Sequence, residues 1–158
     1  MTRIAQILAL IDEAYARQAW HGPNLRGSLR GVPAAVALWR PAPGRHNIWE
    51  IALHTAYWKY AVLRRLTGRK RGSFPLEGSN WFTREGALGA GQWKEELAML
   101  GEQHRQMREC VATLSERALD KTLEGSRVTT LRLVQGIAAH DVYHAGQIQL
   151  LKRLAPGE

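Results

Sequence analysis

The stretch TTLRLVQGIAAHDVYHAGQIQLLKR, residues 129–153, decides the fold of this chain. Its core-facing positions recur every three or four residues, which is the period of a helix that buries one face. We therefore predict a helix from about Thr130, its expected N-cap, to Leu154, with three consecutive polar side chains on the buried seam. That seam is made up of Leu133, Ile137, His140, His144, Gln147, Leu151 and Leu154.

Outside this stretch the sequence also favours helices, because strand-like alternation is nearly absent and there is no Asn-Gly hairpin turn. We expect helices over residues 3–20, 34–38, 47–66 and 92–118. Heptad-like spacing in the helices over 92–118 and 130–154 is typical of shallow packing angles. The predicted fold is all-α, a four-helix bundle, in a single domain over residues 1–158.

The helix over residues 47–66 has recognisable ends. Asn47 is a good N-cap, Glu50 stands where a capping box has its acidic residue, and Gly68 is a suitable C-cap. The Gly-rich stretch over residues 69–91 predicts a long irregular loop, and loops of this length without structure of their own are often functional.

Composition narrows the functional classes. The chain has 158 residues, a net charge of +8 and one cysteine, Cys110, which we interpret as a buried, inert thiol. A single cysteine excludes an internal disulfide and favours a reducing compartment, so we expect the cytoplasm. No apolar run reaches the ~18 residues that a membrane span needs. The densest basic cluster, RRLTGRKR at residues 64–71, is expected to be a solvated helix end, which makes nucleic-acid binding the weaker interpretation.

The polar part of the seam carries the chemistry. Burying an imidazole without a partner costs about 1–3 kcal/mol, so His140 and His144 need one. Two side chains four residues apart share a helix face and can converge on one metal ion. His54, mid-helix among apolar residues, is the best third ligand, and three neutral histidines would leave a coordination position open, as catalytic sites do. The alternative is that each is a core histidine satisfied by its own neighbour.

Three more polar residues have alternative interpretations. His104 is a fourth ligand, a proton shuttle or, in our preferred interpretation, a core histidine hydrogen-bonded to a neighbour. Glu50 accepts a ligand's second N–H or only caps its helix. Asp141 orients a ligand on a neighbouring helix or is solvated.

Four residues close to the histidines in sequence complete the set of candidates. Tyr143 either binds substrate or water near the ion or packs between helices. Gln147 has the same possible role at the ion, or is a core amide bonded to a neighbouring helix. Trp58 is expected either to form a wall of the pocket or to belong to the core. Gly146 is expected to let a neighbouring helix approach closely.

Two stretches, HNIWEIALHTAYWKYAVLRRLTG at residues 46–68 and GIAAHDVYHAGQIQLLKR at residues 136–153, resemble the DinB/YfiT-like superfamily, the DNA-damage-inducible DinB family of bacteria. The resemblance covers most of the chain. It implies a four-helix bundle that holds a divalent ion, zinc or nickel, through His54, His140 and His144. It also implies a homodimer, and some members are transferases that join a low-molecular-weight thiol, such as bacillithiol or mycothiol, to a small-molecule substrate. Other members are thiol-dependent isomerases.

Three functional hypotheses follow. The first is a divalent-metal-dependent transferase or hydrolase that acts on a small electrophile, with a thiol or a water as the nucleophile. The second is a non-catalytic metal-binding stress-response protein, because the seam offers no obvious general base. The third and weakest is a basic nucleic-acid-binding module, carried by the cluster at residues 64–71.

Overall fold

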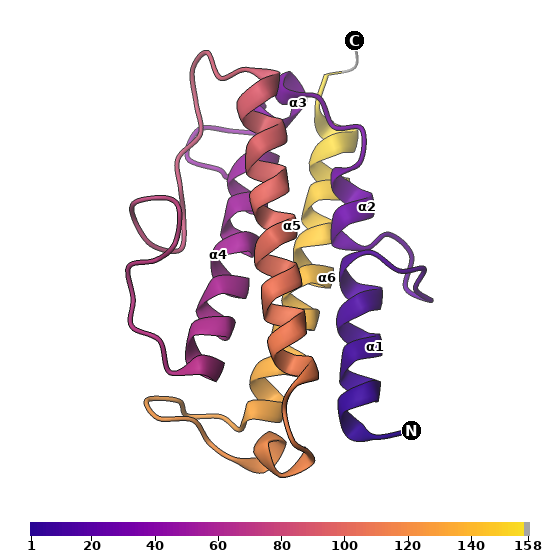
Figure 1. Ribbon diagram of the computed structural model, residues 1–158. Coiled ribbons are helices and arrows are strands. Elements are labelled where there is room, and N and C mark those ends of the chain that lie inside the picture. Colours follow the sequence, from indigo (N-terminus) through magenta and orange to yellow (C-terminus); the bar gives the residue numbers. More distant parts are fainter. Residues whose placement is uncertain (157–158) are drawn as a thin grey trace.

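Four long helices make up the fold, and their starts follow local capping chemistry. Thr2, Asn47 and Thr129 each accept a hydrogen bond from a backbone N–H of the first turn, which satisfies a donor that the helix start leaves free. The computed structural model describes residues 1–156 and has no β-strand in that range (Figure 1), so the predicted all-α fold is confirmed. The long helices are α1 (Arg3–Tyr15), α4 (Ile48–Thr67), α5 (Ala90–Ala112) and α6 (Thr130–Leu154).

The connections contain three short helices, α2 (Leu25–Leu29), α3 (Ala34–Leu38) and the 3₁₀ helix η1 (Glu116–Asp120). The helix α3 lies where the sequence predicted it, whereas α2 was not predicted. Asn24 starts α2 by accepting a hydrogen bond from the Gly27 N–H at 2.8 Å.

Three predicted helix boundaries were wrong. The helix expected over residues 92–118 ends at Ala112, because the N–H groups of Thr113 and Leu114 donate to the carbonyls of Cys110 and Val111 and close its last turn. The first helix ends at Tyr15 instead of residue 20, because the N–H groups of Ala16 and Arg17 both donate to the carbonyl of Asp12 and close the last turn. The N-cap of α6 is Thr129 instead of Thr130, whose hydroxyl donates to the carbonyl of Lys121.

The ends of α4 agree better with the sequence. Asn47 caps its start by accepting from the Glu50 N–H at 2.9 Å, and Gly68 ends it in the left-handed region at φ 67°. The reciprocal half of the capping box is not formed. The Glu50 carboxylate accepts hydrogen bonds from Arg40 and from the backbone N–H of Arg84 instead.

The direction of the helices explains the long loop. α1 packs against α5 and α6, and α4 packs against the same two helices. Figure 1 shows α1 and α6 running one way and α4 and α5 the other. Since α4 and α5 are parallel neighbours, the chain has to return along the bundle between them, and residues 68–89 do so without a helix or a strand.

A polar level lies between two apolar clusters of the core. Along α4 it falls between Ala56 of one cluster and Val62 of the other, and it is occupied by Lys59. The equivalent positions are His104 on α5, between Leu100 and Met107, and Asp141 on α6, between Ala138 and Ile148. All three polar side chains are buried.

The prediction for Asp141 was wrong, because this residue is neither solvated nor bonded to a histidine. Its carboxylate accepts from the Lys59 ammonium at 2.6 Å, and neither residue is more than 1% exposed. A residue next to His140 points about 100° away around the helix, which directs Asp141 into the core and not into the histidine cluster. A charge at this depth needs an opposite charge, and Lys59 provides it.

His104 is a core residue, as preferred, and lies outside the group formed by the three histidines predicted as ligands. Its ring stacks on Tyr15 with the centroids 3.6 Å apart and an angle of 12° between the planes. The predicted hydrogen bond to a neighbour does not form at His104 Nδ1, which has no partner among the described residues. Burial and, secondarily, the nearby Lys59 lower the pKa of His104 to about 3, so the ring is neutral at pH 7.

Three further expectations concern single residues and membrane spans. Gly146 does not admit a close neighbour, because a Cβ built there would meet nothing within 4 Å, so that prediction was wrong. Cys110 is half-buried, and burial raises its pKa, which fits an inert thiol. Among the described residues, every helix is too short or too polar to cross a bilayer.

Candidate metal centre

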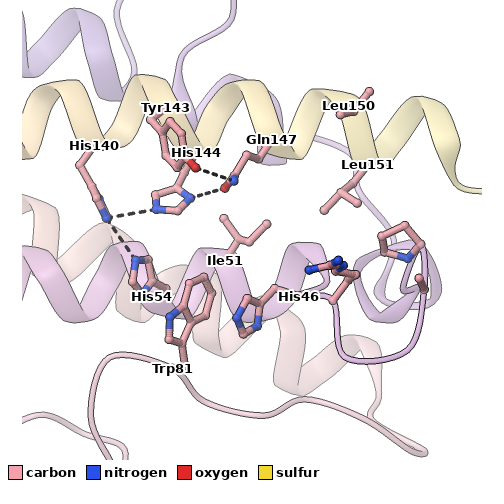
Figure 2. Close-up of a pocket in the computed structure, with 13 residues that line it drawn as sticks. His46, Ile51, His54, Trp81, His140, Tyr143, His144, Gln147, Leu150 and Leu151 are labelled. Carbon is pink, nitrogen blue, oxygen red and sulfur yellow. Dashed lines mark hydrogen bonds between the residues drawn. The ribbon is translucent and has the colours of Figure 1, made fainter.

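The three predicted histidines meet between α4 and α6. His54 Nε2 lies 3.2 Å from His140 Nε2, which in turn lies 3.1 Å from His144 Nε2. The three candidate ligand atoms all lie within 4.8 Å of one another. Figure 2 shows the three rings pointing toward a common point, two from one helix and one from the other. Their convergence, inferred from spacing alone, is thus observed, whereas metal binding itself stays a prediction.

His54 is oriented by the long loop. Its Nδ1–H donates to the carbonyl of Asn80 at 2.7 Å, which leaves the Nε2 lone pair facing the other histidines. Asn80 also accepts from Trp58 Nε1 through its side chain at 2.8 Å. The ring of Trp81 stacks on His54, with centroids 3.8 Å apart. The loop therefore determines both the tautomer and the plane of this imidazole.

His144 is oriented from within its own helix. Its Nδ1–H donates to Gln147 Oε1 at 2.6 Å, and Gln147 Nε2 donates to the Tyr143 hydroxyl at 3.2 Å. The expected bond from Gln147 to a neighbouring helix was wrong, because Gln147 accepts from His144 on its own helix. Gln147 also lines the pocket, so its role toward substrate or water stays a prediction. Tyr143 does not pack between helices, because it is 64% exposed, and it lines the pocket at the cluster, so its alternative role of binding substrate or water stays a prediction.

The cluster is chemically suited to a cation. With Nδ1–H groups engaged on His54 and His144, both Nε2 atoms are acceptors, and the single Nε2–H that His140 can offer satisfies only one of them. At least one buried lone pair then faces another nitrogen without a proton between them. A tetrahedral ion with bonds of 2.0–2.1 Å separates its ligands by about 3.3 Å, close to the separations seen here.

Electrostatics keeps the three rings in the form that binds metal. Burial lowers the pKa of His140 to about 3 and that of His144 to about 4, with repulsion between the histidines adding to the effect. Burial also lowers the pKa of His54, partly opposed by its bond to Asn80. All three imidazoles are neutral at pH 7, so no imidazolium has to lose its proton before an ion binds.

A pocket of about 720 Å³ opens onto the cluster. Trp81 forms one wall, between His54 and His46, and it stacks on the His46 ring with centroids 3.6 Å apart (Figure 2). Trp58, the wall predicted from sequence, does not line this pocket, although its ring lies edge-on to His54 and His140. The aromatic wall was missed because it comes from the loop.

A chain of ion pairs holds this loop against the helices. Arg84 donates to Glu96 on α5 at 2.7 Å, while the Arg84 backbone donates to Glu50 on α4 at 2.9 Å. Arg40 completes the chain by donating to Glu50 at 2.9 Å. Glu50 therefore anchors the loop and does not accept the N–H of a candidate ligand, which corrects the role predicted for it. These arginines carried no helical period, so the sequence offered no signal for them.

Comparison with known proteins agrees with this architecture. The family model described as the DinB superfamily matches residues 16–148, a range that includes all three histidines. No curated protein and no solved structure matches the chain.

Proposed function

The chain belongs to the DinB superfamily, and on that premise we propose that it is a divalent-metal-dependent enzyme acting on a small electrophilic molecule. The observation that supports this proposal is the meeting of three neutral histidine Nε2 atoms at an open pocket. A structural metal site is usually closed by a fourth protein ligand, whereas a site with three protein ligands and an adjacent pocket leaves a position for a reactant. Zinc and nickel are the ions that we expect.

The bound ion would supply a positive charge that acidifies a coordinated thiol or water. The residues of the chain prepare the site for it. Asn80 and Gln147 keep protons on Nδ1 of His54 and His144, so that Nε2 is free on both. Trp81 covers one side of His54 and limits the access of water from the loop side.

Between the two reactions, the pocket favours thiol transfer over hydrolysis. Among the described residues that line it there is no Asp or Glu, and the one lining histidine outside the cluster, His46, is separated from His54 by the ring of Trp81. A thiol has an ordinary pKa near 8.5 and needs only a small shift to ionise at neutral pH, whereas water starts near 15.7. We therefore propose a thiol-dependent transferase, with hydrolysis as the second possibility.

The lack of a general base directly beside the histidine cluster supports one alternative, a metal-binding stress-response protein without catalysis. The two proposals differ in what the cluster does after metal is bound. In the alternative, loss of a histidine lowers stability and metal content but changes no reaction, because there is no reaction to change.

The deciding experiment starts from protein purified without a histidine tag. Elemental analysis should find about one zinc or nickel per chain, and none in His54→Ala or His140→Ala. The metal-loaded protein is then assayed with 1-chloro-2,4-dinitrobenzene and a panel of thiols that includes bacillithiol, mycothiol, glutathione and cysteine. Thiol-dependent turnover that both variants lack supports the enzyme. Bound metal without turnover on any thiol or water supports the alternative, and a metal-free wild type contradicts both.

A further inference from the structure

The charge of the pocket is one-sided. Its lining contains a guanidinium, Arg45, and among the described lining residues there is no carboxylate to balance it. Within residues 1–156, no Asp or Glu makes an ion pair with Arg45, whereas Arg40 pairs with Glu50 and Arg84 with Glu96. Arg45 is therefore a lining cation without a partner in the fold.

The two carboxylates nearest to the site in sequence are already engaged. Glu50 accepts from Arg40, His46 and the Arg84 N–H, and these contacts lower its pKa to about 2, against the opposing effect of burial. Asp141 is held in the core by Lys59. Neither pairs with Arg45, which is exposed to solvent, so its guanidinium is available to the anionic group of a ligand.

The walls between the two polar ends are apolar. Ile51 on α4 and Leu151 on α6 face the same space, with Leu150 at its edge, and Trp81 closes the loop side (Figure 2). Arg45 directly precedes His46, which lies on the side of Trp81 away from His54. The pocket thus has a cationic end, an apolar middle and the histidine cluster at the other end.

From this arrangement we propose that the pocket binds an elongated small molecule with an anionic group, a carboxylate or a phosphate, on Arg45. Its apolar body lies along Ile51, Leu151 and Trp81, and its reactive end lies at the histidines. The placement of the reactive end rests on the proposed function. With a divalent ion bound, three neutral histidines would leave its positive charge uncompensated, and this charge would add to the preference of the pocket for an anion. The Arg45 end stands on the pocket alone.

The test is isothermal titration calorimetry with three probes that share an alkyl chain: octanoate, octyl phosphate and the neutral octanamide. We expect at least one anion to bind wild-type protein about tenfold or more tightly than octanamide. Arg45→Gln should remove most of that advantage and leave octanamide within about twofold. The tighter of the two anions identifies the natural group. Shortening octanoate to butanoate should weaken binding about two- to fourfold per methylene if the walls are used.

The matched control is Arg117→Gln, which removes the same charge from an exposed position on η1. It should bind all probes as the wild type does. Every sample is measured with zinc and after zinc removal, and its zinc content is determined.

The inference is overturned if neither anion binds better than octanamide, or if Arg45→Gln keeps the full preference. It is also overturned if the preference for the anion survives Arg45→Gln but is lost when zinc is removed, because the anion then binds to the ion and not to Arg45. A protein that takes up neither zinc nor nickel contradicts the proposed function, and the comparison of Arg45→Gln with wild type still decides the anion site.

Discussion

Asn80 has a backbone conformation that side chains rarely adopt. Its φ is 68°, and it is the one non-glycine residue with a positive φ in the part of the chain described here. Asparagine tolerates this region better than most residues, although at some cost. The conformation directs the Asn80 carbonyl onto His54 Nδ1 while the side chain meets Trp58. A local strain of this kind at a candidate ligand is typical of functional sites.

Two substitutions separate the backbone of Asn80 from its side chain. Asn80→Gly keeps the left-handed backbone and loses only the bond to Trp58, whereas Asn80→Ala is strained by about 1 kcal/mol as well. We expect Asn80→Ala to bind zinc more weakly than Asn80→Gly, as measured by competition with a chromogenic chelator. Equal affinities in the two variants would show that the backbone conformation does not position His54.

A second pair of substitutions, at Gln147, tests the hydrogen bond that orients His144. Gln147→Leu removes the acceptor of the His144 Nδ1–H, so zinc affinity should fall about 10- to 100-fold. Gln147→Glu keeps an acceptor and should bind zinc at least as well as the wild type. The chelator competition assay measures both, and an unchanged affinity in Gln147→Leu would contradict the orienting role.

At the scale of elements, the buried pair of Lys59 and Asp141 joins α4 to α6, the same two helices that supply the histidines. Burial lowers the pKa of Lys59 and raises that of Asp141, and their attraction opposes both shifts. A buried charge without its partner is costly, whereas replacing both charges by apolar groups is often neutral. The pair therefore sets how α4 and α6 rotate and slide relative to each other more than it adds net stability.

Removing one member of this pair should be far worse than removing both. We expect Lys59→Met to lower the free energy of unfolding by about 3–5 kcal/mol, and Lys59→Met with Asp141→Leu to recover most of it. Urea denaturation of metal-free protein measures this. As a control, Arg105→Met, which breaks exposed ion pairs with Glu102 and Glu109, should lower the free energy of unfolding by no more than about 1 kcal/mol. A double variant as unstable as the single one would contradict this account of the pair.

For the whole molecule, the parallel course of α4 and α5 brings together everything that surrounds the site. It forces residues 68–89 back along the bundle, and this return carries Asn80, Trp81 and Arg84 to the histidine end of α4. The polar level between the two apolar clusters lies at the centre of the same bundle. Its neutral histidine makes the stability of the fold sensitive to pH.

His104 should account for a defined part of that pH dependence. Its pKa is about 3 in the folded protein and near 6.5 when unfolded, so below pH 6.5 the unfolded chain binds more protons. The contribution of neutral His104 to the free energy of unfolding is therefore fully present above about pH 6.5 and is lost as the pH falls toward 3. Between pH 7 and pH 5 this one group should cost about 2 kcal/mol.

The measurement compares metal-free wild type with His104→Phe, which keeps a ring against Tyr15 but cannot be protonated. Urea denaturation at pH 7 and pH 5 should show the variant losing about 2 kcal/mol less than the wild type. The histidines of the cluster contribute equally in both proteins, so they cancel in the difference. Equal losses would show that His104 is not held neutral.

Local sequence patterns were sufficient to predict the helical period, the caps Asn47 and Gly68, and the places of His54, His140 and His144 on inward-facing sides of their helices. Each of these depends on neighbours within one or two turns, so the local pattern is sufficient. The predicted capping box at Glu50 does not form, because the Glu50 carboxylate accepts hydrogen bonds from Arg40 and Arg84, which are distant in the sequence.

The hydrogen-bond partners of those histidines, in contrast, could be identified only from the packed structure. Lys59 and Asp141 are 82 residues apart, and His54 meets Asn80 across 26 residues. No periodic pattern encodes such pairs, because they depend on how the helices rotate against each other and on the path of the loop. A seam of polar residues shows that partners must exist, since burial without them is costly, but only packing selects them.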